Sequence, residues 1–227
     1  MATVARDPGP LREQMLAAGR YLIDYGGVSP SRHGNMSVRL AGTDLILLTT
    51  PSLDGFGVDD LPLLDLEGRL VEGHIDPNAR EIIHMHTAVY RKRPDVGSVV
   101  HTHAIYATAF AVASRPINCV YEGLARRGVV DPVPVARYGP RGSEQAVRNI
   151  VDVLGESTKA VLLENHGILA FDRSVQEAAG VVIALEEAAM LSLFATALGG
   201  PKLIPREMAN ASIKRAADFQ QQGTLQA

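Results

Sequence analysis

The sequence contains a single cysteine, Cys119, and no tryptophan. One cysteine cannot form an intramolecular disulfide, and it cannot supply the several thiolates of a structural zinc site. If this chain binds a metal ion, the ligands must therefore be histidine and carboxylate side chains.

The chain also lacks an excess of charge of either sign. Its 22 Lys and Arg residues are offset by 25 Asp and Glu residues, which gives a formal net charge of -3. The basic residues are spread through the sequence and form no stripe of the kind that follows a phosphate backbone. We therefore expect no nucleic-acid partner.

Long uncharged apolar runs are missing as well. The first ten residues, MATVARDPGP, have no apolar core of signal-peptide length. The most apolar late stretch, residues 180–198, carries Glu186 and Glu187 in its middle, which disfavours a membrane span. We therefore expect a cytoplasmic protein with no membrane partner.

What remains is an ordinary globular composition, with 46% apolar and 21% charged residues. A length of 227 residues makes one domain over 1–227 the default expectation. Apolar spacing and turn residues predict helices at 11–25, 78–92, near 104–113, 143–154 and 174–198. The same signals predict strands at 35–40, 44–49, 96–103 and 160–171, the last broken at Gly167, and a hairpin within 64–71. The strands come in runs, which favours an α/β or α+β layered sheet over a doubly wound fold.

Histidines suggest the chemistry. His101 and His103 stand at positions i and i+2 of a predicted strand, so both side chains point to one face. A third histidine, His166, ends an apolar strand and is followed by Gly167, which permits a backbone bend. Three neutral imidazoles with open coordination positions are typical of a catalytic zinc site.

Other titratable residues have two interpretations each. His33, His74 and His86 fit the usual role of satisfied core or loop histidines. Glu81 lies early on the helix predicted at 78–92, where the helix dipole favours a solvated carboxylate. Alternatively, Glu81 faces the metal pocket, where it binds the ion or exchanges a proton with a substrate.

Several motifs occur in the order found in one known family. They are Gly34 to Arg39, Thr50-Pro51-Ser52, Glu81, Arg93-Pro94-Asp95, His101 to Ala104, and Asn165-His166-Gly167. On these residues the chain resembles the class II aldolase/adducin family, which includes sugar-phosphate aldolases and epimerases. The resemblance spans a core of about residues 10 to 198 and leaves a C-terminal helix and tail at 199–227.

The resemblance implies a three-layer α/β/α sandwich with a largely antiparallel central sheet. It further implies a homotetramer with active sites at the subunit interfaces and one divalent metal per subunit, held by His101, His103 and His166. Zinc is the expected ion, with Mn, Co, Fe and Mg as alternatives. Glu81 would be the catalytic acid/base, while Asn35 and Ser52 would bind the distal end of a small-molecule substrate.

The chain departs from the sugar-phosphate members of that family before Glu81. Ala79 and Arg80 stand there instead of a pair of serines that binds phosphate. Arg32 also replaces a small hydroxyl residue ahead of the Gly34-Asn35 motif. Arg32 and Arg80 are able to form bidentate bonds to a carboxylate. The substrate is therefore expected to be carboxylated rather than phosphorylated, unless both arginines only face solvent.

A second departure concerns the proton donor. The aldolases of this family take a tyrosine from the C-terminal tail, and no tyrosine follows Tyr138 here. Tyr121 is the substitute candidate, with a buried or interface role as the other interpretation.

Together these features predict a lyase that cleaves a hydroxy-carbonyl substrate in an aldol-type reaction, through an enediolate stabilised by the metal. Decarboxylation of a hydroxylated acid would use the same ion and is the first alternative. A sugar-phosphate epimerase or dehydratase is the second alternative, and a non-catalytic adducin-type module is the third.

Overall fold

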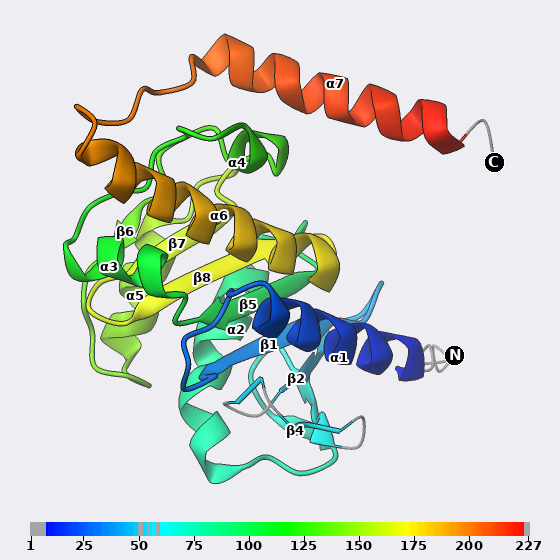
Figure 1. Ribbon diagram of the computed structural model, residues 1–227. Coiled ribbons are helices and arrows are strands. Elements are labelled where there is room, and N and C mark those ends of the chain that lie inside the picture. The colour runs from blue at the N-terminus through cyan, green and yellow to red at the C-terminus, as the bar shows by residue number, and fades with distance from the viewer. Residues whose placement is uncertain (1–7, 50–51, 54, 58–59, 225–227) are drawn as a thin grey trace.

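The computed structural model describes residues 8–49, 52–53, 55–57 and 60–224. Its strands form one eight-stranded sheet with the order β4-β3-β2-β1-β5-β8-β7-β6 (Figure 1). Their bounds are β1 Gly34–Arg39, β2 Leu45–Leu48, β3 Leu63–Asp65, β4 Leu70–Glu72, β5 Ser98–Thr102, β6 Val135–Ala136, β7 Ala160–Leu163 and β8 Gly167–Asp172.

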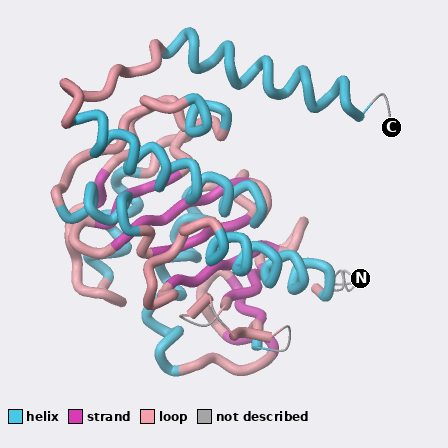
Figure 2. Tube along the Cα trace, in the orientation of Figure 1, coloured by secondary structure: helices cyan, strands magenta, loops and turns pink. Residues whose placement is uncertain are grey.

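Helices cover both faces of this sheet (Figures 1 and 2). Their bounds are α1 Gly9–Asp24, α2 Arg80–Lys92, α3 Ile105–Val112, α4 Glu122–Arg126, α5 Glu144–Val153, α6 Val175–Thr196 and α7 Arg206–Thr224, with a 3-10 turn at Pro77–Ala79 before α2. Helix α7 lies against α4, and its C-terminal part extends away from the other helices (Figure 2).

Alternating side chains of the strands build two separate cores. Val100 faces the core that the sheet forms with α1, α3 and α6, whereas Val99 faces the core formed with α2 and α5. The strand pairings are antiparallel except between β6 and β7, within the described residues. The expected three-layer α/β/α sandwich with a largely antiparallel sheet is thus confirmed.

Helix α6 is the apolar stretch in which the sequence places Glu186. Among the described residues it alone is long and apolar enough to cross a membrane, but 67% of its apolar window is buried inside the fold. The Glu186 carboxylate accepts hydrogen bonds from the backbone N–H groups of Tyr106 and Ala107, each at 2.8 Å. It therefore satisfies the first turn of α3, which begins two residues after His103.

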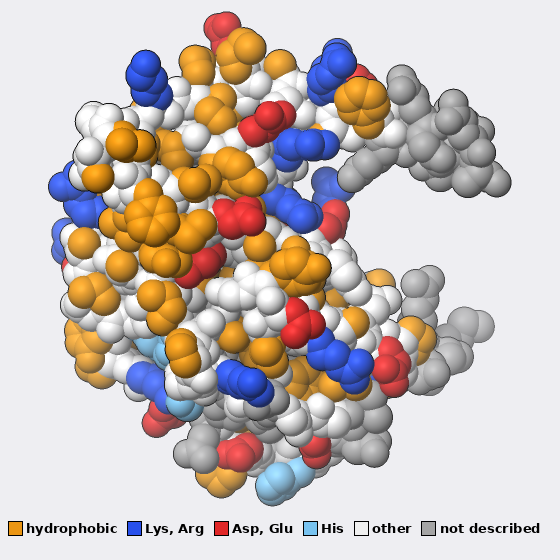
Figure 3. All heavy atoms as spheres, viewed as in Figure 1, with side chains coloured by type: hydrophobic (Ala, Val, Ile, Leu, Met, Phe, Trp, Pro, Cys, Tyr) orange, Lys and Arg blue, Asp and Glu red, His pale blue; other side chains and the backbone are white. Residues whose placement is uncertain are grey.

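The outer side of α6 and α3 leaves apolar side chains uncovered. Figure 3 shows these side chains gathered over the two helices, and they include Ile105, Val112, Leu191 and Phe194, which are 52%, 58%, 41% and 59% exposed. A contiguous exposed apolar surface of this kind marks an interaction site.

The strand predicted over 160–171 is wrong in one respect. The break is a complete reversal, because β7 and β8 pair antiparallel and Leu163 faces Gly167 across the turn. Asn165 in that turn has a φ of +57°, a conformation that Asn adopts more readily than most residues. The residues before and after the turn are equally typical of β-strands, so their composition could not show that the chain reverses direction there. The short elements α4 and β6 were not predicted either.

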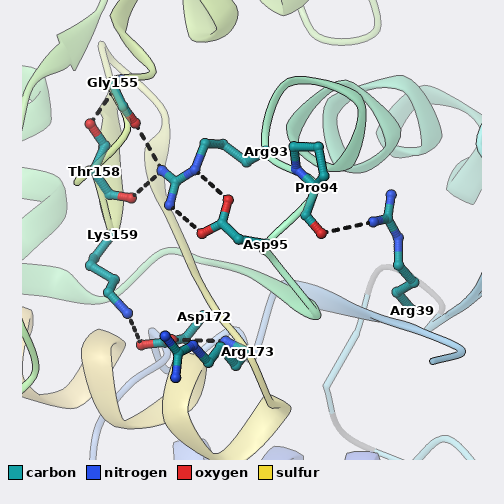
Figure 4. A network of polar contacts seen from close by, with 9 residues as sticks. All are labelled: Arg39, Arg93, Pro94, Asp95, Gly155, Thr158, Lys159, Asp172 and Arg173. Atoms are coloured by element: carbon teal, nitrogen blue, oxygen red, sulfur yellow. Dashed lines mark hydrogen bonds and ion pairs between the residues drawn. The ribbon is translucent and has the colours of Figure 1, made fainter. Parts of the chain in front are cut away.

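The Arg93-Pro94-Asp95 motif has a structural role at the end of α2 (Figure 4). The guanidinium of Arg93 donates to both carboxylate oxygens of Asp95, at 2.8 and 2.7 Å. It also donates to the carbonyl oxygens of Gly155 and Thr158, at 2.8 and 2.9 Å. These bonds fasten the end of α2 to the loop before β7.

Candidate metal centre and active site

Three histidines converge where β5 ends and the β7–β8 turn begins. The ring centroids of His101 and His103 are 5.0 Å apart, and those of His103 and His166 are also 5.0 Å apart. The His101 and His166 rings are 4.8 Å apart, and one nitrogen from each of the three rings lies within 4.8 Å of the others. His101 and His103, which the sequence places on one strand, therefore lie close to His166, which it places on another.

His101 lies in the centre of the sheet, opposite Asn35 of β1 and Leu169 of β8. Its Nδ1 atom is 2.8 Å from the carbonyl oxygen of Ile168. A carbonyl oxygen can only accept, so Nδ1 carries the proton and the lone pair is on Nε2. Such a hydrogen bond to the far nitrogen is the usual arrangement behind a metal-ligating histidine.

An unpaired nitrogen of His103 shows whether the three histidines fit a cation. Its Nε2 atom is buried and has no hydrogen-bond partner among the described residues. Buried polar nitrogens are nearly always paired, because an unpaired one loses its hydration without compensation. A cation held by the three rings would satisfy this atom, so the residues fit a metal ion.

The protonation of the three rings also suits a cation. Burial holds the pKa of His101 well below its usual value, and burial lowers the pKa of His103 to about 4. Burial is likewise the main reason that the pKa of His166 is lowered, and the positive charge of Arg141 adds to the effect. All three imidazoles are therefore neutral near pH 7, which is the form that binds metal.

Gly167 allows the third histidine to approach the other two. A Cβ atom at this position would lie 2.6 Å from the carbonyl oxygen of Thr102 and 2.7 Å from Cδ2 of His103. Both distances are shorter than any normal contact. The His166-Gly167 pair in the sequence therefore has a steric explanation.

The histidines open into a pocket between the sheet and the helices α2 and α5. Its other polar and charged lining residues are His33, Asn35, Glu81, Arg137, Tyr138, Arg141, Ser143 and Glu164. Glu81 comes from the first turn of α2 and is half-exposed. Its Oε2 atom is 2.9 Å from Nε of Arg141, so the expected carboxylate of the pocket is present and forms an ion pair.

Asn35 is buried and lines the same pocket. Its Oδ1 atom is 2.6 Å from Nε2 of His86, a fully buried histidine of α2. With the amide oxygen engaged, the amide N–H groups of Asn35 are the part that faces the pocket. The interpretation of His86 as a satisfied core histidine fits this arrangement.

The structure does not bring the other expected site residues to this pocket. Arg80 and Arg32 are both exposed and do not line it. Because successive side chains of a helix point about 100° apart, Arg80 turns outward when Glu81 turns inward. Ser52 forms an isolated bridge with His33 at the rim, and its neighbours Thr50 and Pro51 lie outside the described residues.

Tyr121 is also distant from this pocket within one chain. It precedes α4 and packs against the core of α6 rather than lining the pocket. The negative charge of Glu187 on α6 raises the pKa of the Tyr121 hydroxyl. Tyr121 therefore does not line the pocket of this chain.

Six polar or charged pocket residues were not predicted from the sequence, namely His33, Arg137, Tyr138, Arg141, Ser143 and Glu164. His33 lies with its ring 6.3 Å from that of His103, and Arg141 comes from the loop between β6 and α5. Ser143, the N-cap of α5, shows from the sequence where that loop ends. No periodicity exists in such a loop to show that Arg141 turns toward the pocket.

Comparisons with known proteins agree with this architecture. The family described as "Class II Aldolase and Adducin N-terminal domain" matches residues 13–193. A 5-deoxy-D-ribulose 1-phosphate aldolase of Bacillus thuringiensis serovar kurstaki is 28% identical over 215 residues, which cover 93% of this chain and 97% of that protein. An L-fuculose phosphate aldolase of Escherichia coli O6:H1 is 30% identical over 175 residues, which cover 77% of this chain and 79% of that protein.

Solved structures extend the similarity to three dimensions. An L-fuculose 1-phosphate aldolase superposes with a TM-score of 0.81 at 25% identity, covering 94% of this chain and 99% of that one. The L-fuculose-1-phosphate aldolase of Thermus thermophilus gives a TM-score of 0.69 at 26% identity, covering 85% of this chain and 98% of that one. Because these relatives are aldolases, the prediction of a lyase is confirmed at the level of enzyme class. The chain belongs to the class II aldolase and adducin family.

Proposed function

We propose that this protein is a divalent-metal-dependent lyase that cleaves a carbon–carbon bond in a small hydroxy-carbonyl substrate by an aldol-type reaction. The convergence of His101, His103 and His166 in a pocket that also contains Glu81 carries this proposal. An adducin-type module without catalytic function would not require this combination of neutral ligands and a carboxylate.

The three histidines would hold the ion, and zinc suits a set of imidazole nitrogens. When bound, such an ion acts as a Lewis acid that polarises a substrate carbonyl group. Because His101, His103 and His166 are neutral, they would not offset the positive charge of the bound ion. Their arrangement at the end of the sheet leaves the pocket side open to a substrate.

Glu81 would move the proton. Its carboxylate lines the pocket that holds the histidines and therefore lies close to the bound substrate. A carboxylate there can deliver a proton to the substrate carbon that loses its bond partner, or remove a proton in the reverse direction. Asn35 would orient the substrate through its amide N–H groups.

The exposed apolar side chains over α3 and α6 support a homo-oligomer, and we propose a tetramer with active sites at the subunit interfaces. In such an assembly a residue of a neighbouring subunit, including Tyr121, would be able to complete the pocket. The enzyme would act in the cytoplasm on a small molecule.

A metal analysis combined with a product screen tests the proposal. The purified protein is stripped of metal, reloaded separately with zinc, cobalt, manganese or magnesium, and incubated with hydroxy acids and sugar phosphates. We expect metal-dependent release of an aldehyde, measured with a coupled NADH assay. Release of carbon dioxide without an aldehyde would replace aldol cleavage by decarboxylation, and failure to bind any ion would refute the proposal.

A further inference from the structure

Two arginines, Arg137 and Arg141, line the pocket, and Arg141 is the one that forms an ion pair with Glu81. We propose that its guanidinium recognises a carboxylate group of the substrate, and that Glu81 occupies this position until the substrate binds. The inference rests on the proposed function, and it adds the substrate class and the residue that selects it.

The geometry places the Arg141 charge where a substrate would lie. Its Nε atom is 2.9 Å from Oε2 of Glu81, and the two side chains are 50% and 54% exposed. Arg141 also lines the pocket into which His101, His103 and His166 open. The guanidinium therefore lies in the same pocket as the proposed base and the proposed metal ligands.

The loop that carries Arg141 packs directly on Glu81. Gly142 has a φ of +76°, and a Cβ atom built on it would lie 3.2 Å from Cβ of Glu81. A larger residue at Gly142 would be strained and would also press on Glu81. The close packing keeps the Arg141 side chain within reach of the carboxylate.

The ion pair is well suited to an exchange of partners. Pairs between half-exposed side chains are weak, since water screens both charges. When a substrate carboxylate replaces that of Glu81, the guanidinium keeps a partner of the same chemistry. Glu81 is then released beside the substrate, so the same event that binds the correct substrate also makes the base available.

The pocket favours a carboxylate over a phosphate. A guanidinium can form two parallel hydrogen bonds to a carboxylate or to a phosphate, but a phosphate dianion has a third oxygen that is left for further donors. Ser143 is the only serine or threonine among the described residues that line the pocket, and its Oγ accepts the N–H of Ala146 as a helix cap, while Arg137 and Tyr138 are further side-chain donors there. Arg80 and Arg32, the arginines expected from the sequence, do not line the pocket.

The experiment measures binding rather than turnover. The zinc-loaded full-length protein is titrated with 5-hydroxy-4-oxopentanoate, with its neutral amide, and with dihydroxyacetone phosphate. We expect the wild-type protein to bind the carboxylate about tenfold more tightly than the amide, as for a charge-assisted hydrogen-bonded pair. Arg141→Gln should abolish this preference and leave the affinity for the amide within about twofold, while Arg141→Lys should retain part of it.

Arg148→Gln is the matched control. Arg148 lies on α5, forms an ion pair with Glu144 at 3.0 Å and does not line the pocket. This variant should retain the wild-type preference. Glu81→Gln provides a second test, because loss of the competing carboxylate should strengthen binding of the probe about threefold.

Three results would overturn the inference. They are equal affinity of the wild-type protein for the acid and the amide, a preference that survives in Arg141→Gln, and tighter binding of dihydroxyacetone phosphate than of the carboxylate. The zinc content of each sample separates these results from failure of the proposed function. If one of these results is obtained with a protein that holds zinc and binds the amide, only the role of Arg141 is refuted, whereas a protein that binds no zinc refutes both proposals.

Discussion

The Nε2 atom of His86 lies 2.6 Å from Oδ1 of Asn35, and this bond connects the core behind the sheet with the pocket. On its other side the His86 ring is 2.7 Å from Oγ of Ser37, which is 2.8 Å from the hydroxyl of Tyr90. These buried groups satisfy one another in a chain. The orientation of the Asn35 amide therefore depends on a histidine that does not line the pocket.

The first prediction concerns the pH dependence of stability. Burial lowers the pKa of His86 to about 3 from its ordinary value of 6.5. Between these values the unfolded chain binds a proton that the folded chain does not, so folding stability falls as the pH decreases from 6.5 toward 3. His86→Gln should reduce this slope by about 1 kcal/mol per pH unit, measured by urea unfolding at several pH values.

His84→Gln is the control for this measurement, because His84 is on the same helix and is exposed. An unchanged slope in His86→Gln would show that the buried ring is not the group that titrates.

The second prediction concerns the metal. His103→Ala should lose nearly all bound zinc and all turnover, because one of three ligands is removed. His74→Ala, at an exposed position before α2, should retain both. Metal content by mass spectrometry and the d–d spectrum of cobalt-loaded protein measure the result. A His103→Ala variant that binds zinc as tightly as the wild-type protein would contradict the proposed ligand set.

The third prediction separates metal binding from proton transfer. Glu81→Gln should retain the full metal content and lose turnover by about a hundredfold or more, since general acid–base catalysis contributes factors of this size. Single-turnover kinetics on the zinc-loaded variant provide the measurement. A wild-type rate in this variant would exclude Glu81 as the acid/base.

The fourth prediction concerns the Arg93 network in Figure 4. Arg93→Met should destabilise the fold by about 2 kcal/mol, because the carbonyl groups of Gly155 and Thr158 would lose their donor. Arg69→Met is the control, since the side chain of Arg69 is 75% exposed in its pair with Asp65, and its effect should be much smaller than that of Arg93→Met. Chemical denaturation measures both, and equal effects would show that the network contributes little.

The layered fold and the convergence of the three histidines could be predicted from the sequence for physical reasons. On a strand, the spacing of His101 and His103 forces both rings to one face, whatever the rest of the fold is. Gly167 after His166 similarly indicates a position where the backbone lies close to another part of the chain. Side chains on regular elements inherit their direction from the backbone, so the sequence pattern carries this information.

Residues on loops and at helix ends could not be assigned in this way. Arg80 was expected in the pocket because of its position next to Glu81, but the helix turns it outward. Arg141 was missed because its direction depends on how one loop packs on α2. The direction of the chain at Asn165 was missed because a strand and its reversed partner have the same composition.

The position of Arg141 has a consequence for how such enzymes diverge. The β6–α5 loop contributes no metal ligand, and its ends are held by the pairing of β6 with β7 and by the Ser143 cap. Substitutions within this loop would therefore alter which substrate the proposed enzyme accepts while the three histidines stay in place. Substrate selectivity and metal binding would then lie on separate pieces of the chain, so selectivity could change without loss of the metal centre.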